Sequence, residues 1–188
     1  MTEMALPTVG AALPVAMLAG CREWLLEGQR DLEIQDAFRP EVLDGDWGAL
    51  VRQARAALDG YTGRLGIHGP FDGLTLMSRD PQVRALVTGR LRQGLEFAAE
   101  VGATHMVVHS PFIFLGTPFL PHSAGFDQAA QFELVHATLE PVLALAQQAN
   151  CTLMIENILD KNPAPLLELV RSFRSEYVRM SLDTGHAF

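Results

Sequence analysis

Cysteine and basic residues are both scarce in this sequence. The 188 residues contain two cysteines, Cys21 and Cys151, which lie far apart and outside any Cys-rich segment. This pattern excludes a disulfide scaffold and a zinc ribbon, and it is typical of a cytoplasmic protein. Only 14 Lys and Arg side chains stand against 22 Asp and Glu, and the net charge of −8 repels polyanions on average. A nucleic-acid partner is therefore disfavoured, although a local basic patch stays an alternative.

The sequence also lacks a hydrophobic segment that would cross a membrane. An apolar stretch near the N-terminus covers residues 5–19, which is shorter than the roughly 20 residues that a spanning helix needs. No Lys or Arg precedes Arg22, so this stretch lacks the basic segment that begins a signal peptide. We therefore expect no membrane partner, and we interpret residues 14–18 as the first buried strand.

Short β-rich segments alternate with helix-like segments along the chain. With 48% hydrophobic residues, a chain of this length can bury one sizeable core, so we expect residues 1–188 to form a single domain. The alternation predicts parallel βαβ units and therefore an α/β fold. Six strands are predicted, at residues 14–18, 31–36, 64–68, 104–109, 152–157 and 178–183.

Apolar residues between the predicted strands repeat at helical spacing. Helices are predicted around residues 50–58, 83–95, 132–146 and 165–173. Asp80 and Pro81 supply a start signal for the second helix, and Gly102 supplies its end. The segment 110–126 contains three prolines and four phenylalanines and no clear element. We interpret it as a packed lid over a site, because long connections without secondary structure are often functional.

Four of the six predicted strands end in side chains that can bind a metal ion. These side chains are His68, His109, Glu156, and Asp183 together with His186. In parallel α/β folds the carboxyl ends of the strands lie at one rim, where loops leave the side chains open to solvent. We therefore expect the five side chains to converge there. The remaining histidines fit this pattern less well, and we expect structural roles for His105 and His136 and only an outside role for His122.

The mixture of imidazole and carboxylate ligands predicts a divalent metal ion as cofactor. It favours zinc, manganese, iron or cobalt over calcium, which prefers oxygen ligands alone, and magnesium stays an alternative. A single histidine at a strand end is more often a satisfied polar residue than a ligand, so the prediction depends on the five residues occurring together. Asn157, beside Glu156, is predicted to support the ligands. Glu33 and Gln35 would share one face of their strand.

The segments "HGP", "VVHSP", "IEN" and "LDTGHA", in this order, resemble the xylose-isomerase-like TIM-barrel superfamily. That group contains sugar and sugar phosphate isomerases and epimerases, and also zinc-dependent apurinic-site endonucleases. The resemblance implies a (β/α) TIM-barrel fold, of which this chain would hold about six of eight βα units. We expect a C-terminally truncated chain, while closure of the sheet by a second chain and a degenerate partial barrel stay open as alternatives.

The resemblance also implies roles for the five rim residues. Glu156 and Asp183 match the two metal ligands that both branches share. His186 matches a histidine that contacts substrate in the epimerases and binds a further zinc ion in the endonucleases. His68 and His109 match the pair that completes the multinuclear zinc site of the endonuclease branch.

Three functions follow as hypotheses. The first is a metal-dependent isomerase or epimerase of a small sugar, polyol or sugar phosphate, in which Glu156 and His186 act catalytically through carbonyl polarisation and proton transfer. The second is a zinc-dependent phosphodiesterase similar to the apurinic-site endonucleases. The third is a non-catalytic partial-barrel binding module. A homo-oligomer is compatible with each of them.

Overall fold

The protein folds around one parallel sheet of six strands that follow one another in chain order, β1-β2-β3-β4-β5-β6. The computed structural model describes residues 8–112, 127–160 and 162–186. The strands are β1 (Ala11–Leu13), β2 (Leu32–Ile34), β3 (Leu65–His68), β4 (His105–His109), β5 (Thr152–Glu156) and β6 (Val178–Ser181). Each strand pairs in parallel with the next, which confirms the predicted α/β fold built from βαβ units.

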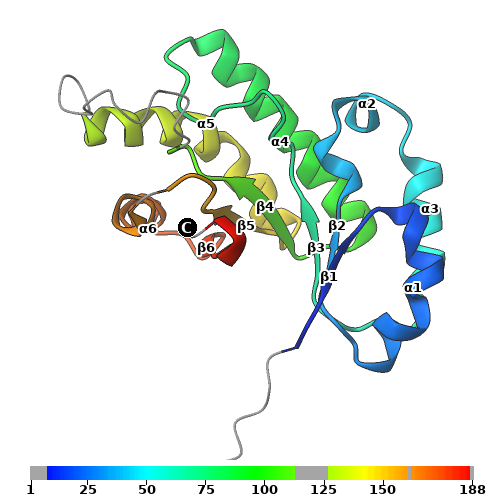
Figure 1. Cartoon of the computed structure of the whole chain (residues 1–188). Coiled ribbons are helices and arrows are strands. Elements are labelled where there is room, and N and C mark those ends of the chain that lie inside the picture. The colour runs from blue at the N-terminus through cyan, green and yellow to red at the C-terminus, as the bar shows by residue number, and fades with distance from the viewer. Residues whose placement is uncertain (1–7, 113–126, 161, 187–188) are drawn as a thin grey trace, which may run out of the picture.

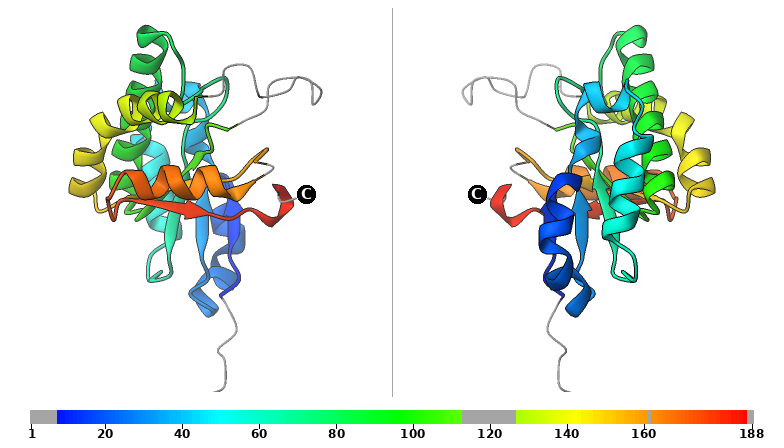
Figure 2. Two further views of the ribbon diagram at one scale, coloured as in Figure 1. Left: turned by 90° about the vertical axis from the view of Figure 1, so that its left-hand side faces the viewer. Right: turned by 90° about the vertical axis from the view of Figure 1, so that its right-hand side faces the viewer.

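Helices connect the strands and cover the outer side of the sheet, as Figures 1 and 2 show. The α-helices are α1 (Val15–Glu27), α2 (Pro40–Leu43), α3 (Gly48–Ala57), α4 (Pro81–Val101), α5 (Gln128–Gln148) and α6 (Pro163–Ser172), and the 3₁₀ helices are η1 (Asp36–Phe38) and η2 (Thr184–His186). The predicted end signals of α4 are confirmed. Asp80 accepts a hydrogen bond from the backbone N–H of Gln82 and Gly102 adopts a left-handed conformation with φ of 80°. No helix in the described part of the chain is long and apolar enough to span a bilayer.

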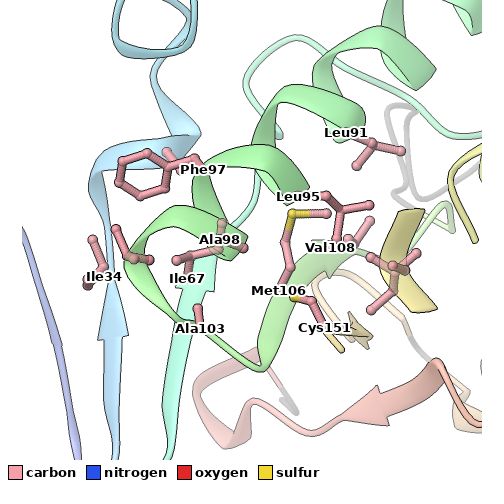
Figure 3. Packing of buried hydrophobic residues seen from close by; sticks show 14 of the residues in the cluster. Ile34, Ile67, Leu91, Leu95, Phe97, Ala98, Ala103, Met106, Val108 and Cys151 are labelled. Carbon is pink, nitrogen blue, oxygen red and sulfur yellow. The ribbon is translucent and has the colours of Figure 1, made fainter. Parts of the chain in front are cut away.

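The core lies between the sheet and the helices. Alternate strand residues such as Ile34, Ile67 and Met106 are fully buried against this layer. They pack on Leu95 and Phe97 of α4, as Figure 3 shows. The intervening strand residues line the opposite face of the sheet and include Glu33, Gly66, Val107 and Met154. This division fixes the register of each strand and therefore decides which residues end each strand at the rim.

The prediction of a strand at residues 14–18 is wrong. These residues begin α1, and the first strand is the short segment Ala11–Leu13 immediately before it. Pro14, with φ of −71°, takes the position before the first helical turn, where its missing N–H costs nothing. Val15, Leu18 and Leu25 are buried on one side of the helix. Their spacing is that of a helix, although the short apolar run taken alone resembles a strand.

The other five predicted strands and the four predicted helices are all present, with boundaries that differ by a few residues. The predicted lid lies mostly outside the described residues, since only Ser110–Phe112 of that segment are described, and His122 also lies outside them. Glu33 and Gln35 share one face as predicted, because the Gln35 side-chain amide donates a hydrogen bond of 2.6 Å to the Glu33 carboxylate.

Candidate metal centre

Three of the predicted rim residues meet at the carboxyl ends of neighbouring strands. His68 ends β3, His109 ends β4 and Glu156 ends β5, and His109 and Glu156 are register partners. One potential ligand atom of each lies within 4.8 Å of the others, and within the described residues these three form the one such group of three or more. Nε2 of His109 lies 3.2 Å from Nε2 of His68 and 3.9 Å from Oε2 of Glu156.

The tautomer of His68 follows from its second ring nitrogen. Nδ1 lies 2.9 Å from the backbone carbonyl oxygen of Gly69, which can only accept a hydrogen bond. Nδ1 therefore carries the proton, and the lone pair of Nε2 points toward His109. A carbonyl oxygen that fixes the outer nitrogen of an imidazole in this way is the usual support of a metal-binding histidine.

The donor set fits a divalent transition metal. Two ligand atoms that each lie about 2.0–2.1 Å from a tetrahedral ion are roughly 3.3 Å apart, close to the 3.2 Å between the two imidazole nitrogens. Two neutral imidazoles and one carboxylate are the ligand set of several catalytic zinc sites, in which a fourth position stays open to water or substrate. The site residues are partly exposed, with side-chain exposures of 18% for His109 and 15% for Glu156. A ligand could therefore reach them from the rim.

The electrostatic environment favours the binding of a cation. Burial raises the pKa of the Glu156 carboxyl to about 7, and the negative charges of Glu33 and Asp183 also raise it, whereas His186 lowers it. Burial lowers the pKa of His109 to about 4, and the neighbouring imidazoles of His68 and His186 also lower it. His109 is therefore neutral at pH 7, which is the form that binds metal.

Asp183 and His186 lie at the same rim but outside the closely spaced group. Oδ2 of Asp183 is 3.6 Å from Nε2 of His186, and both side chains are about two-fifths exposed. Their charges act on the pKa of Glu156, so all five predicted residues share one end of the sheet. The direct binding of a metal ion by Asp183 and His186 stays a prediction.

Asn157 fixes the position of Asp183. Its side-chain amide donates a hydrogen bond of 2.9 Å to the backbone carbonyl of Asp183, and its carbonyl oxygen accepts one of 2.8 Å from the Asp183 backbone N–H. Asn157 is 6% exposed, so this pair of bonds is largely shielded from water. The residue after β5 thus holds the segment that leaves β6 against the rim.

The two histidines that were expected to be structural lie away from the rim. His105 begins β4, at the opposite end of the strand from His109, and its Nδ1 lies 2.8 Å from the hydroxyl of Thr104. His136 lies within α5, where its ring nitrogens contact Glu140 and Ser172 at 2.7 Å and its ring stacks on Phe173. Neither histidine contributes to the group of His68, His109 and Glu156.

Aromatic residues beside the histidines were not predicted as part of the site. Phe71 stacks on the ring of His109 with a centroid distance of 4.2 Å, and it also contacts His68 at 4.7 Å and Phe38 at 5.3 Å. The signal in the sequence is the position of Phe71 three residues after His68, in the turn that follows the strand. Its contact with His109, which is 38 residues distant, depends on the tertiary fold.

Comparison with known proteins agrees with the fold. Residues 27–188 match the family described as "Xylose isomerase-like TIM barrel". The chain belongs to this family, and its six parallel strands correspond to part of the barrel. An uncharacterized protein of Methanocaldococcus jannaschii, MJ1311, is 26% identical over 135 residues, which cover 69% of this chain and 44% of the relative.

Solved structures show the same fold. The TTHB071 protein from Thermus thermophilus, in a structure obtained by soaking with ZnCl₂, has a TM-score of 0.70 and 29% identity, covering 96% of this chain and 68% of that one. A D-tagatose 3-epimerase-like protein has a TM-score of 0.72 and 22% identity, with coverages of 96% and 66%. The chain thus spans less than half the length of MJ1311 and about two thirds of the length of these structures.

Proposed function

We propose that this protein is a metal-dependent isomerase or epimerase that acts on a small sugar or sugar phosphate. The observation that carries the proposal is the group of His68, His109 and Glu156 at the carboxyl rim of a xylose-isomerase-like sheet. The rim is where enzymes with this type of fold place their active sites. The name of one structural neighbour, a D-tagatose 3-epimerase-like protein, supports the reaction class.

His68, His109 and Glu156 would hold the ion, with Asp183 as a further candidate ligand. A bound divalent ion would polarise a carbonyl group of the sugar and so make the adjacent C–H more acidic. Glu156, whose carboxylate a bound ion would keep ionised, would accept the proton from that carbon and return it. His186, exposed at the rim beside Asp183, would contact a substrate hydroxyl.

Zinc-dependent phosphodiester hydrolysis is a second candidate function. It is favoured by the presence of both His68 and His109 in the closely spaced group, since the resemblance assigns this pair to the multinuclear zinc site of the endonuclease branch. It is disfavoured by the net charge of −8, because binding of nucleic acid depends largely on contacts between basic side chains and phosphates. A non-catalytic binding module is the third candidate.

The test combines metal analysis with assays of both reactions. Purified protein would be titrated with Zn²⁺, Mn²⁺, Co²⁺ and Mg²⁺ and then assayed for isomerisation and epimerisation of ketoses and aldoses and for cleavage of DNA with an abasic site. We expect Glu156→Gln to weaken metal binding by more than about 100-fold. Removing a residue that only hydrogen-bonds a metal ligand already costs roughly 10–100-fold, and Glu156 would be a ligand itself. Glu133→Gln, an exposed position on α5, is the matched control. Cleavage of abasic DNA without sugar turnover would select the second function. A folded protein that binds none of the four ions and shows neither activity would select the third.

A further inference from the structure

The turn after β3 is held tightly against β4. The backbone N–H of Gly69 donates a hydrogen bond of 2.9 Å to the carbonyl oxygen of Val107. A Cβ atom at position 69 would lie 2.6 Å from this oxygen and 2.9 Å from Cγ of Met106, distances at which something must shift. Only glycine therefore allows the turn to lie this close to the neighbouring strand.

The next residue of the turn is fixed from its other side. Pro70 packs on Gly94 of α4, where a Cβ atom would lie 3.0 Å from Cδ of the proline and 2.9 Å from the sulfur of Met106. The proline ring also limits the backbone at this position to a single φ region. The backbone leading to Phe71 is thus confined between β4 and α4, and the direction in which the Phe71 side chain leaves the turn follows from it.

Phe71 places its ring on the imidazole of His109. The two rings stack with an interplanar angle of 29° and a centroid distance of 4.2 Å. Phe38 belongs to the same aromatic group, and its ring centroid is 5.3 Å from that of Phe71. His68 and His109 meet edge to face, at an interplanar angle of 82°. The stacking therefore fixes the plane of the His109 ring at the angle that turns its Nε2 toward the Nε2 of His68.

The two histidines are oriented by different means. His68 is fixed by its hydrogen bond to the Gly69 carbonyl. Within the described residues, the ring of His109 makes its hydrogen bond to His68 through Nε2, the same atom that would bind an ion. That bond would be lost when an ion binds, whereas the contact with Phe71 would persist. Both supports come from the one segment of residues 68–71.

We infer that Phe71 is a positioning residue, which sets the orientation of the His109 imidazole and thereby the affinity of the centre for a metal ion. This inference rests on the proposed function, in which His109 is a ligand. The contribution is of the type made by outer supporting groups in metal sites, which keep a ligand in its binding rotamer. Phe71 would not touch the ion.

The experiment measures zinc affinity by calorimetry and ring orientation by NMR in the metal-free protein. We expect Phe71→Leu, which keeps an apolar group without a ring, to weaken zinc binding by about 10–100-fold. Phe71→Tyr, which restores the ring, is expected to bind zinc as the unmodified protein does. Phe173→Leu is the matched control, because Phe173 stacks on His136 away from the rim, and its loss should leave zinc affinity unchanged. The NMR readout is the upfield ring-current shift of the His109 side-chain protons, lost in the leucine variant and kept in the tyrosine variant.

Separate outcomes test the inference and the proposed function. Zinc binding of equal strength in the unmodified protein and in Phe71→Leu would overturn the inference and leave the proposed function standing. Absence of zinc binding in the unmodified protein would overturn the proposed function and with it the claim that Phe71 sets metal affinity. If the His109 side-chain protons have the same chemical shifts in Phe71→Leu as in the unmodified protein, the claim that Phe71 orients the ring is also overturned. Thermal unfolding verifies that each variant is folded, and Phe71→Met replaces the leucine variant if the latter does not fold.

Discussion

His109 and Glu156 are direct neighbours across β4 and β5, and their side chains approach to 3.9 Å while their pKa values move in opposite directions. The pKa of the carboxyl is raised to about 7 and that of the imidazole is lowered to about 4, in both cases chiefly by burial. In the metal-free protein both groups therefore favour their neutral forms. A bound cation would favour the ionised carboxylate and the neutral imidazole together, which is the combination that metal binding requires.

The first prediction concerns the dependence of stability on pH in metal-free His109→Gln, which removes the opposing contribution of His109 to the effect of Glu156. The folded pKa of Glu156, about 7, lies above its ordinary value of 4.5, so the folded state binds a proton that the unfolded state releases between these values. The stabilisation is complete below pH 4.5 and is lost as the pH rises through 7. We expect the free energy of unfolding to fall over this window by an amount on the order of 3 kcal/mol or less. Urea unfolding from pH 4 to 8 measures it.

The opposite slope is predicted for metal-free Glu156→Gln, which removes the contribution of Glu156 and leaves that of His109. The folded pKa of His109, about 4, lies below its ordinary value of 6.5, so the unfolded state binds the additional proton. The stabilisation is complete above pH 6.5 and is lost as the pH falls through 4. The free energy of unfolding should therefore rise from pH 4 to 6.5, while the unmodified protein shows a flatter profile because the two contributions oppose each other. Parallel slopes in the two variants would contradict the assigned environments.

A third prediction separates the histidines at the two ends of the sheet. His68→Gln should weaken binding of Zn²⁺ or Co²⁺ by more than about 100-fold, since it removes a ligand whose lone pair is already oriented by Gly69. His105→Gln is the control, because His105 begins β4 and lies away from the rim. Calorimetric titration of both variants under the same buffer compares them. Equal losses of affinity would show that the metal is bound elsewhere.

The sequence was sufficient for the strands that are short apolar runs followed by polar and turn-forming residues, and it therefore placed His68, His109 and Glu156 at strand ends. It failed at residues 14–18, where Val15 and Leu18 fit either a strand or the buried side of a helix, and where the true strand has only small apolar residues before it reaches Leu13. Short apolar runs carry no period long enough to separate the two structures.

The finer geometry of the site depends on contacts between distant segments, which a sequence pattern does not contain. Asn157 was predicted to support the ligands because it adjoins Glu156, but its bonds go to the backbone of Asp183. The stacking of Phe71 on His109 requires the turn after β3 to be held by Val107 and Gly94, which come from other elements.

The fourth prediction tests the close approach of that turn. Gly69→Ala should destabilise the protein by about 1–3 kcal/mol, because the added methyl group would overlap the Val107 carbonyl and the Met106 side chain. Gly89→Ala is the matched control, since a Cβ atom there, within α4, meets nothing within 4 Å. It should stabilise the helix by about 0.5–1 kcal/mol. Thermal unfolding of both variants measures the two effects, and a stable Gly69→Ala protein would show that the turn can move.

The fifth prediction concerns the attachment of Asp183 to the rim. Asn157→Ala removes both hydrogen bonds to the Asp183 backbone and leaves that carbonyl and N–H without their partners, at a cost of about 1–3 kcal/mol in the free energy of unfolding. Asn157→Asp is the informative companion, because its carboxylate can still accept from the Asp183 N–H but can no longer donate to the carbonyl. We expect Asn157→Asp to be at least as unstable as Asn157→Ala at neutral pH, because a carboxylate oxygen would face the Asp183 carbonyl at a nearly buried position. If Asp183 binds the ion, zinc affinity falls in the same order as stability. If affinity is unchanged in both variants, the ion is held by His68, His109 and Glu156 without Asp183.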